Sequence, residues 1–185
     1  KLGIDFISMR WSAEDGLADT YATLEDIYSY IRAKYKLEKN ICDFLMAEEL
    51  HCERQLLQAR ADMEKIYQRA VRSGKRVIAV SDMYLPSSVL KEILWAKGFD
   101  KIDSVYVSCE QKARKDSGKL FNVVLENESI PAEKMVHIGD NFLSDYELPL
   151  RAGIFAIHYP SILDLASNSS DRIWKIVMQS TRDDP

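Results

Sequence analysis

The residues best suited to chemistry are two aspartates that follow a short, mainly apolar run. Residues 135–138 lead into Gly139 and Asp140, and Asp145 comes five residues later. Glycine lets a ligand approach the backbone closely, and carboxylate oxygens are the ligands that Mg²⁺ prefers. The spacing therefore favours a divalent-cation site at Asp140 and Asp145. For this segment by itself, a turn aspartate followed by a surface or capping acid stays open as the alternative.

Further polar candidates stand at the ends of other predicted elements. The apolar run Val77–Val80 ends in Ser81 and Asp82, where a hydroxyl and the N–H groups of the turn could bind phosphate oxygens. Lys115 precedes an amphipathic stretch, and its ammonium could neutralise a phosphate or an aspartyl phosphate. Asn141 is a further candidate for substrate binding. Taken alone, Ser81 is better explained as an ordinary turn residue and Lys115 as a common lysine before a helix, so their joint order carries the information.

Helical periodicity dominates the chain before Gly74. One helix is indicated by the spacing of Ile4, Ile7 and Trp11. Thr23 is expected to cap the next helix. The predicted buried face of that helix consists of Leu24, Ile27, Tyr28, Ile31 and Tyr35. From about Asn40 to Arg72 no proline or glycine interrupts the chain, which predicts either one long helix or two with a bend near residues 59–62. Residues 1–73 are therefore expected to form a helical bundle.

After Gly74, short apolar runs alternate with helices. The expected strands are 76–81, 104–108, 135–139 and 154–158, and helices are expected again over about 162–179. This alternation predicts an α/β fold, with a parallel sheet covered by helices on both faces, over residues 74–185. Ligands of such sheets bind at the carboxyl ends of the strands, where Ser81, Asp82 and residues 139–141 stand.

The order of these residues resembles motifs II, III and IV of the haloacid dehalogenase (HAD) superfamily. Ser81 corresponds to motif II, Lys115 to motif III, and the pair Asp140 and Asp145 to motif IV, with a later glycine at Gly153. The resemblance covers roughly residues 76–158. It implies a Rossmann-like core, with residues 1–73 as a C1-type cap.

The activity that this resemblance implies is Mg²⁺-dependent hydrolysis of a small metabolite or sugar phosphate through an aspartyl-phosphate intermediate. In that scheme Ser81 binds the phosphoryl oxygens, with Asp82 and Asn141 beside the substrate. Lys115 stabilises the phosphoaspartate, and Asp140 ligates Mg²⁺, with Asp145 as a ligand or orienting acid.

A closer resemblance concerns a bacterial HAD-like subgroup often found with glycosyltransferase or capsule-biosynthesis domains. It rests on four segments, 81–86, 106–108, 115–121 and 137–141. The resemblance implies association or fusion with a glycosyltransferase.

The family's first motif, an apolar strand ending Asp-x-Asp, has no counterpart in this sequence. Asp5 is followed two residues later by Ile7 and has no apolar strand before it, so it is not the nucleophile. In the family this strand lies between those of motifs II and IV, and its absence leaves them roughly 10 Å apart. We therefore expect the natural protein to begin upstream of Lys1. A non-catalytic module that binds a phosphorylated ligand or a partner is the alternative, and haloacid dehalogenation is a third.

Composition excludes several other classes. A hydrophobic content of 46% is enough for a packed core, and a formal net charge of −4 gives no attraction to nucleic acid or anionic lipid. The basic residues in 112–119 lack interleaved aromatic side chains, so they indicate a solvated or phosphate-facing loop. Three cysteines without close spacing favour a reducing compartment. The sequence predicts a cytoplasmic protein that has no membrane span.

Overall fold

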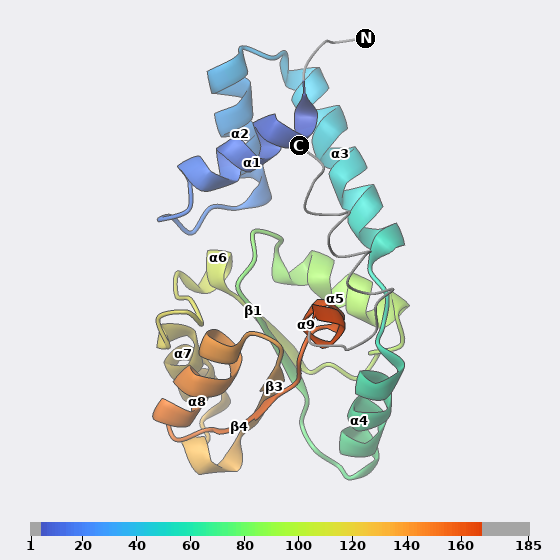
Figure 1. Cartoon of the computed structure of the whole chain (residues 1–185), viewed down its shortest axis with the longest axis vertical. Coiled ribbons are helices and arrows are strands. Elements are labelled where there is room, and N and C mark those ends of the chain that lie inside the picture. Colours follow the sequence, from blue (N-terminus) through green and yellow to red (C-terminus); the bar gives the residue numbers. More distant parts are fainter. Residues whose placement is uncertain (1–4, 168–185) are drawn as a thin grey trace. The chain divides into compact units, whose positions relative to one another are not determined.

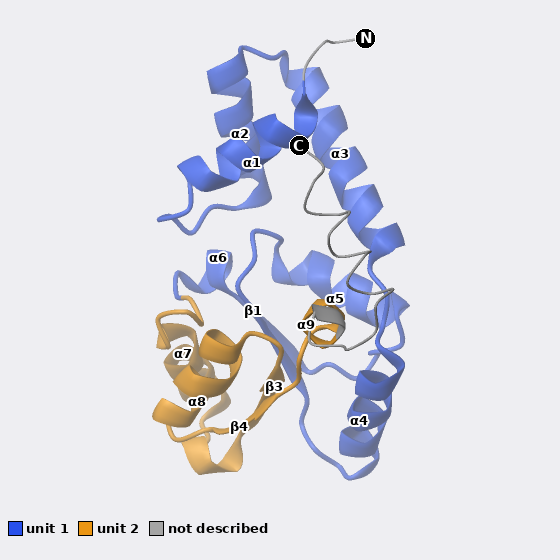
Figure 2. Cartoon of the chain, in the orientation of Figure 1, with its two compact units in different colours: residues 1–113 blue, residues 114–185 orange. Residues whose placement is uncertain are grey.

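The computed structural model describes residues 5–167 of the 185-residue chain. The chain forms two compact units, residues 1–113 and residues 114–185 (Figure 2). The division predicted from sequence, a cap over residues 1–73 and a core over residues 74–185, stays a prediction.

Four helices open the first unit. They are α1 (Phe6–Gly16), α2 (Leu24–Tyr35), α3 (Lys39–Leu56) and α4 (Ala61–Arg72). The predicted cap of α2 is confirmed, because the Thr23 hydroxyl accepts a hydrogen bond from the Asp26 N–H at 3.2 Å. The Asp26 carboxylate in turn accepts one from the Thr23 N–H at 2.9 Å. This reciprocal capping box fixes the first turn of the helix.

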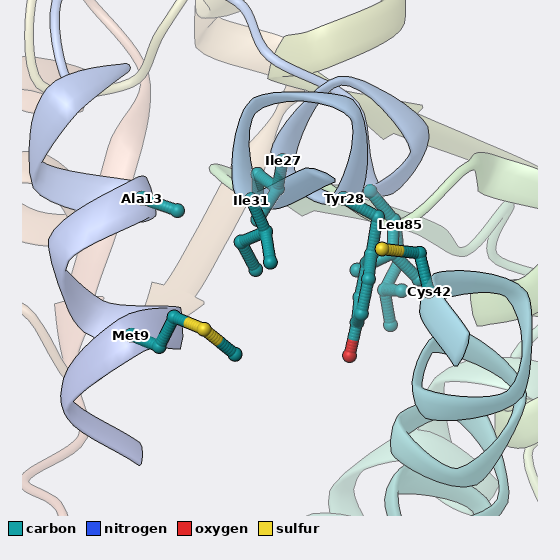
Figure 3. Close-up of a cluster of buried hydrophobic side chains, with 8 residues drawn as sticks. Met9, Ala13, Ile27, Tyr28, Ile31, Cys42 and Leu85 are labelled. Atoms are coloured by element: carbon teal, nitrogen blue, oxygen red, sulfur yellow. The ribbon is translucent and has the colours of Figure 1, made fainter. Parts of the chain in front are cut away.

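A shared apolar core holds α1, α2 and α3 together (Figure 3). The buried members of this core are Met9, Ala13, Leu24, Ile27, Tyr28, Ile31, Cys42 and Leu85. Leu85 comes from the loop that follows the first strand, and its side chain has no exposed area. Each fully buried side chain of this size contributes roughly 1.5–3 kcal/mol of transfer free energy. The core therefore joins the helices to a segment far along the sequence.

Two helical faces differ from those that periodicity suggests. Tyr35, predicted on the buried side of α2, is 37% exposed. In α1, the spacing of Ile7 and Trp11 predicted a helix correctly, yet these side chains are 65% and 70% exposed. Met9 and Ala13 are buried instead, because α1 turns these residues toward α2 and the rest of the core. Ile4, the third residue of that spacing, lies outside the described residues.

The segment predicted as one long helix or two is two helices, since α3 ends at Leu56 and α4 starts at Ala61. The break contains no proline or glycine. Distant contacts hold α4 in its place. The Tyr67 ring packs on the Phe99 ring with centroids 4.9 Å apart, and its hydroxyl accepts the Lys101 N–H at 2.5 Å.

Strands and helices alternate after α4, as predicted (Figure 1). The strands are β1 (Ile78–Ser81), β2 (Ser104–Val107), β3 (Val136–Gly139) and β4 (Phe155–His158). The helical elements are α5 (Ser87–Ala96), α6 (Ser108–Gln111), α7 (Lys119–Glu128), η1 (Ala132–Lys134), η2 (Phe142–Glu147), α8 (Leu148–Arg151) and α9 (Ile162–Ser167). The rest of the predicted C-terminal helical stretch, beyond Ser167, lies outside the described residues.

All strand pairing in residues 5–167 is parallel, but it makes two sheets rather than the single one expected from the alternation. β1 pairs with β2, and β3 pairs with β4. The α/β class and the parallel orientation are confirmed. Within residues 5–167 β1 and β3 do not pair with each other, and the missing central strand stays a prediction.

In the part of the chain that the structure describes, no helix has both the length and the apolar character needed to cross a membrane.

Candidate functional site

A buried charged cluster lies at the carboxyl end of β3 in the second unit. The Lys115 ammonium donates to Asp145 Oδ1 at 2.6 Å, and His137 Nε2 lies 2.9 Å from the same oxygen. The side chains of Lys115, His137 and Asp145 are only 13%, 9% and 4% exposed. Charge-assisted hydrogen bonds of this length are strong and directional. The ammonium is therefore held in one place by a carboxylate that is itself fixed.

The backbone turn places Asp145 against the end of β3. The Asn141 N–H donates to Asp145 Oδ2 at 3.1 Å. A Cβ at Gly139 would meet the Asp145 Cγ at 2.5 Å, closer than real Cβ atoms come to any atom. Sequence reasoning explained this glycine by the close approach of a ligand. In the structure, the group that comes close is the protein's own Asp145 side chain.

The charge of Asp145 is stabilised strongly. Burial by itself raises the pKa of this carboxyl, but hydrogen bonds from His137 and Lys115, the charge of Lys115 and the Asn141 N–H outweigh it and hold the pKa well below its usual range. A carboxylate that is partly shielded from solvent attracts cationic donors more strongly than a carboxylate in bulk water does. Asp145 is therefore an anion throughout the neutral pH range.

Asp140 and Asn141 occupy the turn between β3 and η2. The Asp140 side chain is exposed, while its backbone oxygen lies 2.9 Å from His158 Nε2. The Asn141 side-chain oxygen accepts the Ser144 N–H at 2.9 Å and caps η2. Asn141 therefore has a local structural role in addition to the substrate contact predicted for it.

Ser81 and Asp82 belong to the first unit, at the carboxyl end of β1. Ser81 ends the strand in register with Val107 of β2, and Asp82 is exposed. The Ser108 hydroxyl accepts the Met83 N–H at 3.0 Å, which fixes the turn after Asp82. Ser108, predicted as the last residue of the second strand, instead begins α6.

The six residues predicted for the site thus fall into two groups. The structure brings Lys115, Asn141 and Asp145 into one hydrogen-bonded cluster next to Asp140, and it places Ser81 and Asp82 at the end of β1. The roles assigned to all six stay predictions. His137, which is not one of the six predicted residues, also belongs to the cluster as a buried, hydrogen-bonded imidazole. Its place in strand 135–139, three residues before Asp140, was the one signal that could have linked it to the cluster.

The described residues fit Mg²⁺ incompletely. The Asp140 carboxylate is exposed and of the right chemistry, but both Asp145 oxygens already accept protein hydrogen bonds. No group of three or more His, Cys, Asp or Glu residues within 5–167 is arranged to hold a metal ion. A Mg²⁺ site here needs oxygen ligands besides those that these residues supply.

Comparisons by sequence find no protein-family model and no curated protein that matches the chain. Comparisons by structure do find matches. A haloacid dehalogenase-like family hydrolase from Xanthomonas campestris aligns over 96% of this chain and 77% of its own, with a TM-score of 0.56 and 16% identity. A dehalogenase solved with an intermediate complex aligns over 92% of this chain and 78% of its own, with the same TM-score and identity.

The chain has the haloacid dehalogenase-like fold. An uncharacterized protein from Listeria monocytogenes serotype 4b also matches, at 22% identity and a TM-score of 0.45, over 52% of this chain. The chain spans 58% of the length of that protein. At these identities the likeness concerns the HAD-like fold, and activity is a separate question.

Proposed function

We propose that the protein is a HAD-type phosphomonoester hydrolase that acts on a small metabolite or sugar phosphate. The observation that carries the proposal is the Lys115 ammonium, held 2.6 Å from a buried carboxylate at the end of β3. Phosphoryl transfer depends mainly on positioning and charge neutralisation rather than on elaborate covalent chemistry. An ammonium that is fixed before substrate arrives can neutralise phosphoryl oxygens without reorganising.

The remaining roles follow the resemblance to HAD phosphatases. Ser81 would bind phosphoryl oxygens with its hydroxyl and the N–H groups of the turn after β1. Asp82 and Asn141 would contact the substrate. Asp145 orients Lys115, a role that the hydrogen bond between the two side chains supports.

Mg²⁺ dependence is part of the proposal because the HAD-like fold typically uses this ion. Asp140 is the residue best placed to bind it, since its carboxylate is exposed beside the cluster. Because the described residues fit Mg²⁺ only in part, the ion would need oxygen ligands in addition to those that these residues supply.

An aspartyl-phosphate mechanism also needs a nucleophilic carboxylate. Its oxygen would bond to phosphorus as the ester oxygen leaves with a proton, and water would then hydrolyse the acyl phosphate. We propose that this aspartate belongs to a strand upstream of Lys1. The resemblance to motifs II, III and IV, which in that superfamily accompany such a strand, supports that proposal.

The alternative is a non-catalytic module that binds a phosphorylated ligand or a partner, including a glycosyltransferase in the same assembly. The observation in its favour is that none of the 185 residues supplies an apolar strand ending Asp-x-Asp. The two proposals differ in whether phosphate is released.

A phosphatase assay on the natural full-length chain separates them. We expect Mg²⁺-dependent release of phosphate from p-nitrophenyl phosphate, reduced about 10²- to 10³-fold by Lys115→Ala and abolished by Asp140→Ala. Lys134→Ala, which removes an exposed lysine from the same unit, is the matched control and should leave the rate unchanged. Absence of turnover with intact phosphate binding would favour the non-catalytic module. Halide release from a 2-haloacid, without phosphate release, would instead indicate a dehalogenase.

A further inference from the structure

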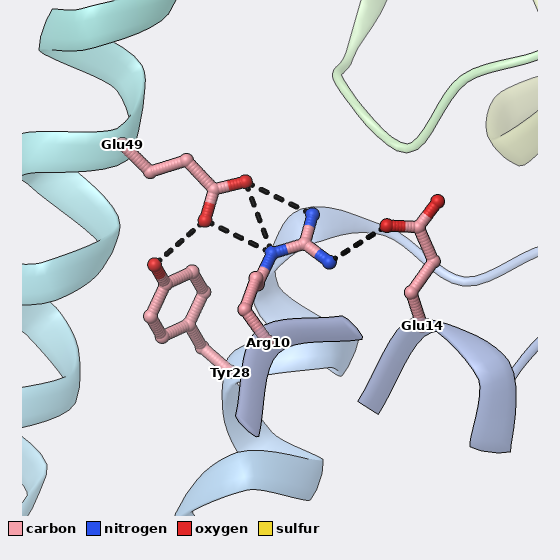
Figure 4. A network of polar contacts seen from close by, with 4 residues as sticks. All are labelled: Arg10, Glu14, Tyr28 and Glu49. Carbon is pink, nitrogen blue, oxygen red and sulfur yellow. Dashed lines mark hydrogen bonds and ion pairs between the residues drawn. The ribbon is translucent and has the colours of Figure 1, made fainter. Parts of the chain in front are cut away.

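A second buried charge cluster lies among the helices of the first unit (Figure 4). The Arg10 guanidinium of α1 donates to both oxygens of Glu49 on α3, with the shortest distance 2.9 Å. The Tyr28 hydroxyl donates to the same carboxylate at 2.7 Å, and Glu14 accepts from Arg10 at 2.9 Å. The side chains of Arg10 and Glu49 are 8% and 14% exposed.

Stability alone is a weak reason to keep such a pair. Removing two charges from water costs about as much as their attraction returns, so an apolar pair of similar volume often serves equally well. Burial by itself lowers the pKa of Arg10, but the hydrogen bonds and charge of Glu49 outweigh it and raise that pKa. The Arg10 guanidinium is therefore permanently charged and is held in one orientation between α1 and α3.

That cation lies over Tyr84, in the loop after β1. The guanidinium carbon is 4.7 Å from the centre of the Tyr84 ring, the distance of a cation–π contact. Burial raises the pKa of the Tyr84 hydroxyl to about 12, with the Arg10 charge acting in the opposite direction. The ring is thus a neutral aromatic face held against the charge.

The backbone beside Tyr84 is fastened to the same helices. The Tyr84 carbonyl accepts the Leu24 N–H at 3.0 Å, at the first residue of α2. Leu85 is buried in the core of α1, α2 and α3. At the other end, Ser81 is paired with β2 and the Met83 N–H is held by Ser108. The turn at Ser81 and Asp82 is therefore attached to the β1–β2 sheet on one side and to helices α1, α2 and α3 on the other.

We propose that Arg10 is a positioning residue that orients the Ser81–Asp82 turn for phosphate by holding Tyr84. Phosphate affinity then depends on an ion pair that the ligand does not touch. This inference rests on the proposed function, since it takes the turn as a phosphate-binding element.

The test compares Arg10→Met with Arg54→Met in the whole chain. Arg54 is a matched control because it lies on α3 of the same unit and pairs with the exposed Glu92. Thermal melts select a temperature at which every variant is folded. In ligand-free protein, the amide resonances of Ser81, Asp82 and Met83 should move in Arg10→Met and stay in place in Arg54→Met.

Titration with inorganic phosphate gives the second measurement. We expect about fivefold weaker binding in Arg10→Met, the loss of a single cation–π contact, partial recovery in Arg10→Lys, and unchanged binding in Arg54→Met. If Arg10→Met does not fold, Tyr84→Leu removes the same contact and leaves the ion pair in place. Unmoved amide resonances in a folded variant would overturn the positioning role. Moved resonances in a protein that binds no phosphate would uphold the positioning and overturn the proposed function.

Discussion

Two buried carboxylates, Glu49 among the helices and Asp145 at the end of β3, each accept from a long basic side chain. Glu49 faces the planar fork of Arg10, which uses both of its oxygens. Asp145 directs one oxygen to both Lys115 and His137, and its other oxygen to a backbone N–H. Arginine's fork suits fixed geometry, whereas a lysine ammonium is a compact point charge. The difference indicates that the Arg10–Glu49 pair fixes the geometry of the helices, whereas the Lys115–Asp145 pair fixes a positive charge at the end of β3.

The largest expected effect is the loss of the Asp145 charge. Asp145→Asn leaves the Lys115 ammonium buried without its counter-charge, which should cost about 3–5 kcal/mol of unfolding free energy. Urea denaturation measures this cost. The control Glu147→Gln, which breaks the exposed pair with Arg151, should cost less than about 1 kcal/mol. Equal costs in both variants would show that Asp145 is not the anchor of the cluster.

Breaking the Arg10–Glu49 pair should lower the free energy of unfolding much more than replacing the whole pair with apolar side chains does. Arg10→Met alone leaves the Glu49 carboxylate buried without the Arg10 counter-charge, at a cost of about 3 kcal/mol in urea denaturation. The triple variant Arg10→Met, Glu49→Leu, Tyr28→Phe should return to within about 1 kcal/mol of the wild type. A triple variant as unstable as the single one would mean that this ion pair stabilises the fold directly, and the contrast with Asp145 would disappear.

Gly139→Ala tests how tightly Asp145 is held. The new methyl group would overlap the Asp145 side chain, which cannot move without losing its hydrogen bonds. The overpacking should cost about 1–3 kcal/mol and weaken the contact with Lys115. Gly139 is not among the glycines with positive φ, so this cost reports the steric overlap and not backbone strain. A structure of Gly139→Ala with unchanged Lys115–Asp145 distance would contradict the tight packing.

The pH dependence of the unfolding free energy should include a contribution from Asp145. Its pKa is lower in the folded protein than the value of 3.8 for a free carboxyl, so its stabilisation is complete above that value and is lost as pH falls below it. The slope for this one proton is at most about 1.4 kcal/mol per pH unit. Unfolding free energies measured between pH 6 and pH 2 should fall less steeply in Asp145→Asn. Parallel profiles for the two proteins would show that the charge of Asp145 is not specially stabilised.

Local patterns were sufficient for several features of the molecule. The cap at Thr23, the four strands and the order Ser81, Lys115, Asp140 and Asp145 could all be predicted, because capping and strand periodicity depend on residues close in sequence. The resemblance of that order to known motifs also predicted the haloacid dehalogenase-like fold, which the structural comparisons confirm.

The sequence alone could not decide which side of α1 is buried, why α3 ends at Leu56, or that Arg10 meets Glu49 across 39 positions. It also left open whether Asp145 is a metal ligand beside Asp140 or an orienting acid, and only the structure shows that Asp145 contacts Lys115 and His137. The physical reason is the same in each case. A side chain's type and local spacing set what it can bind, but a buried charge takes the partner that packing brings within hydrogen-bond distance, and only the tertiary structure decides which partner that is.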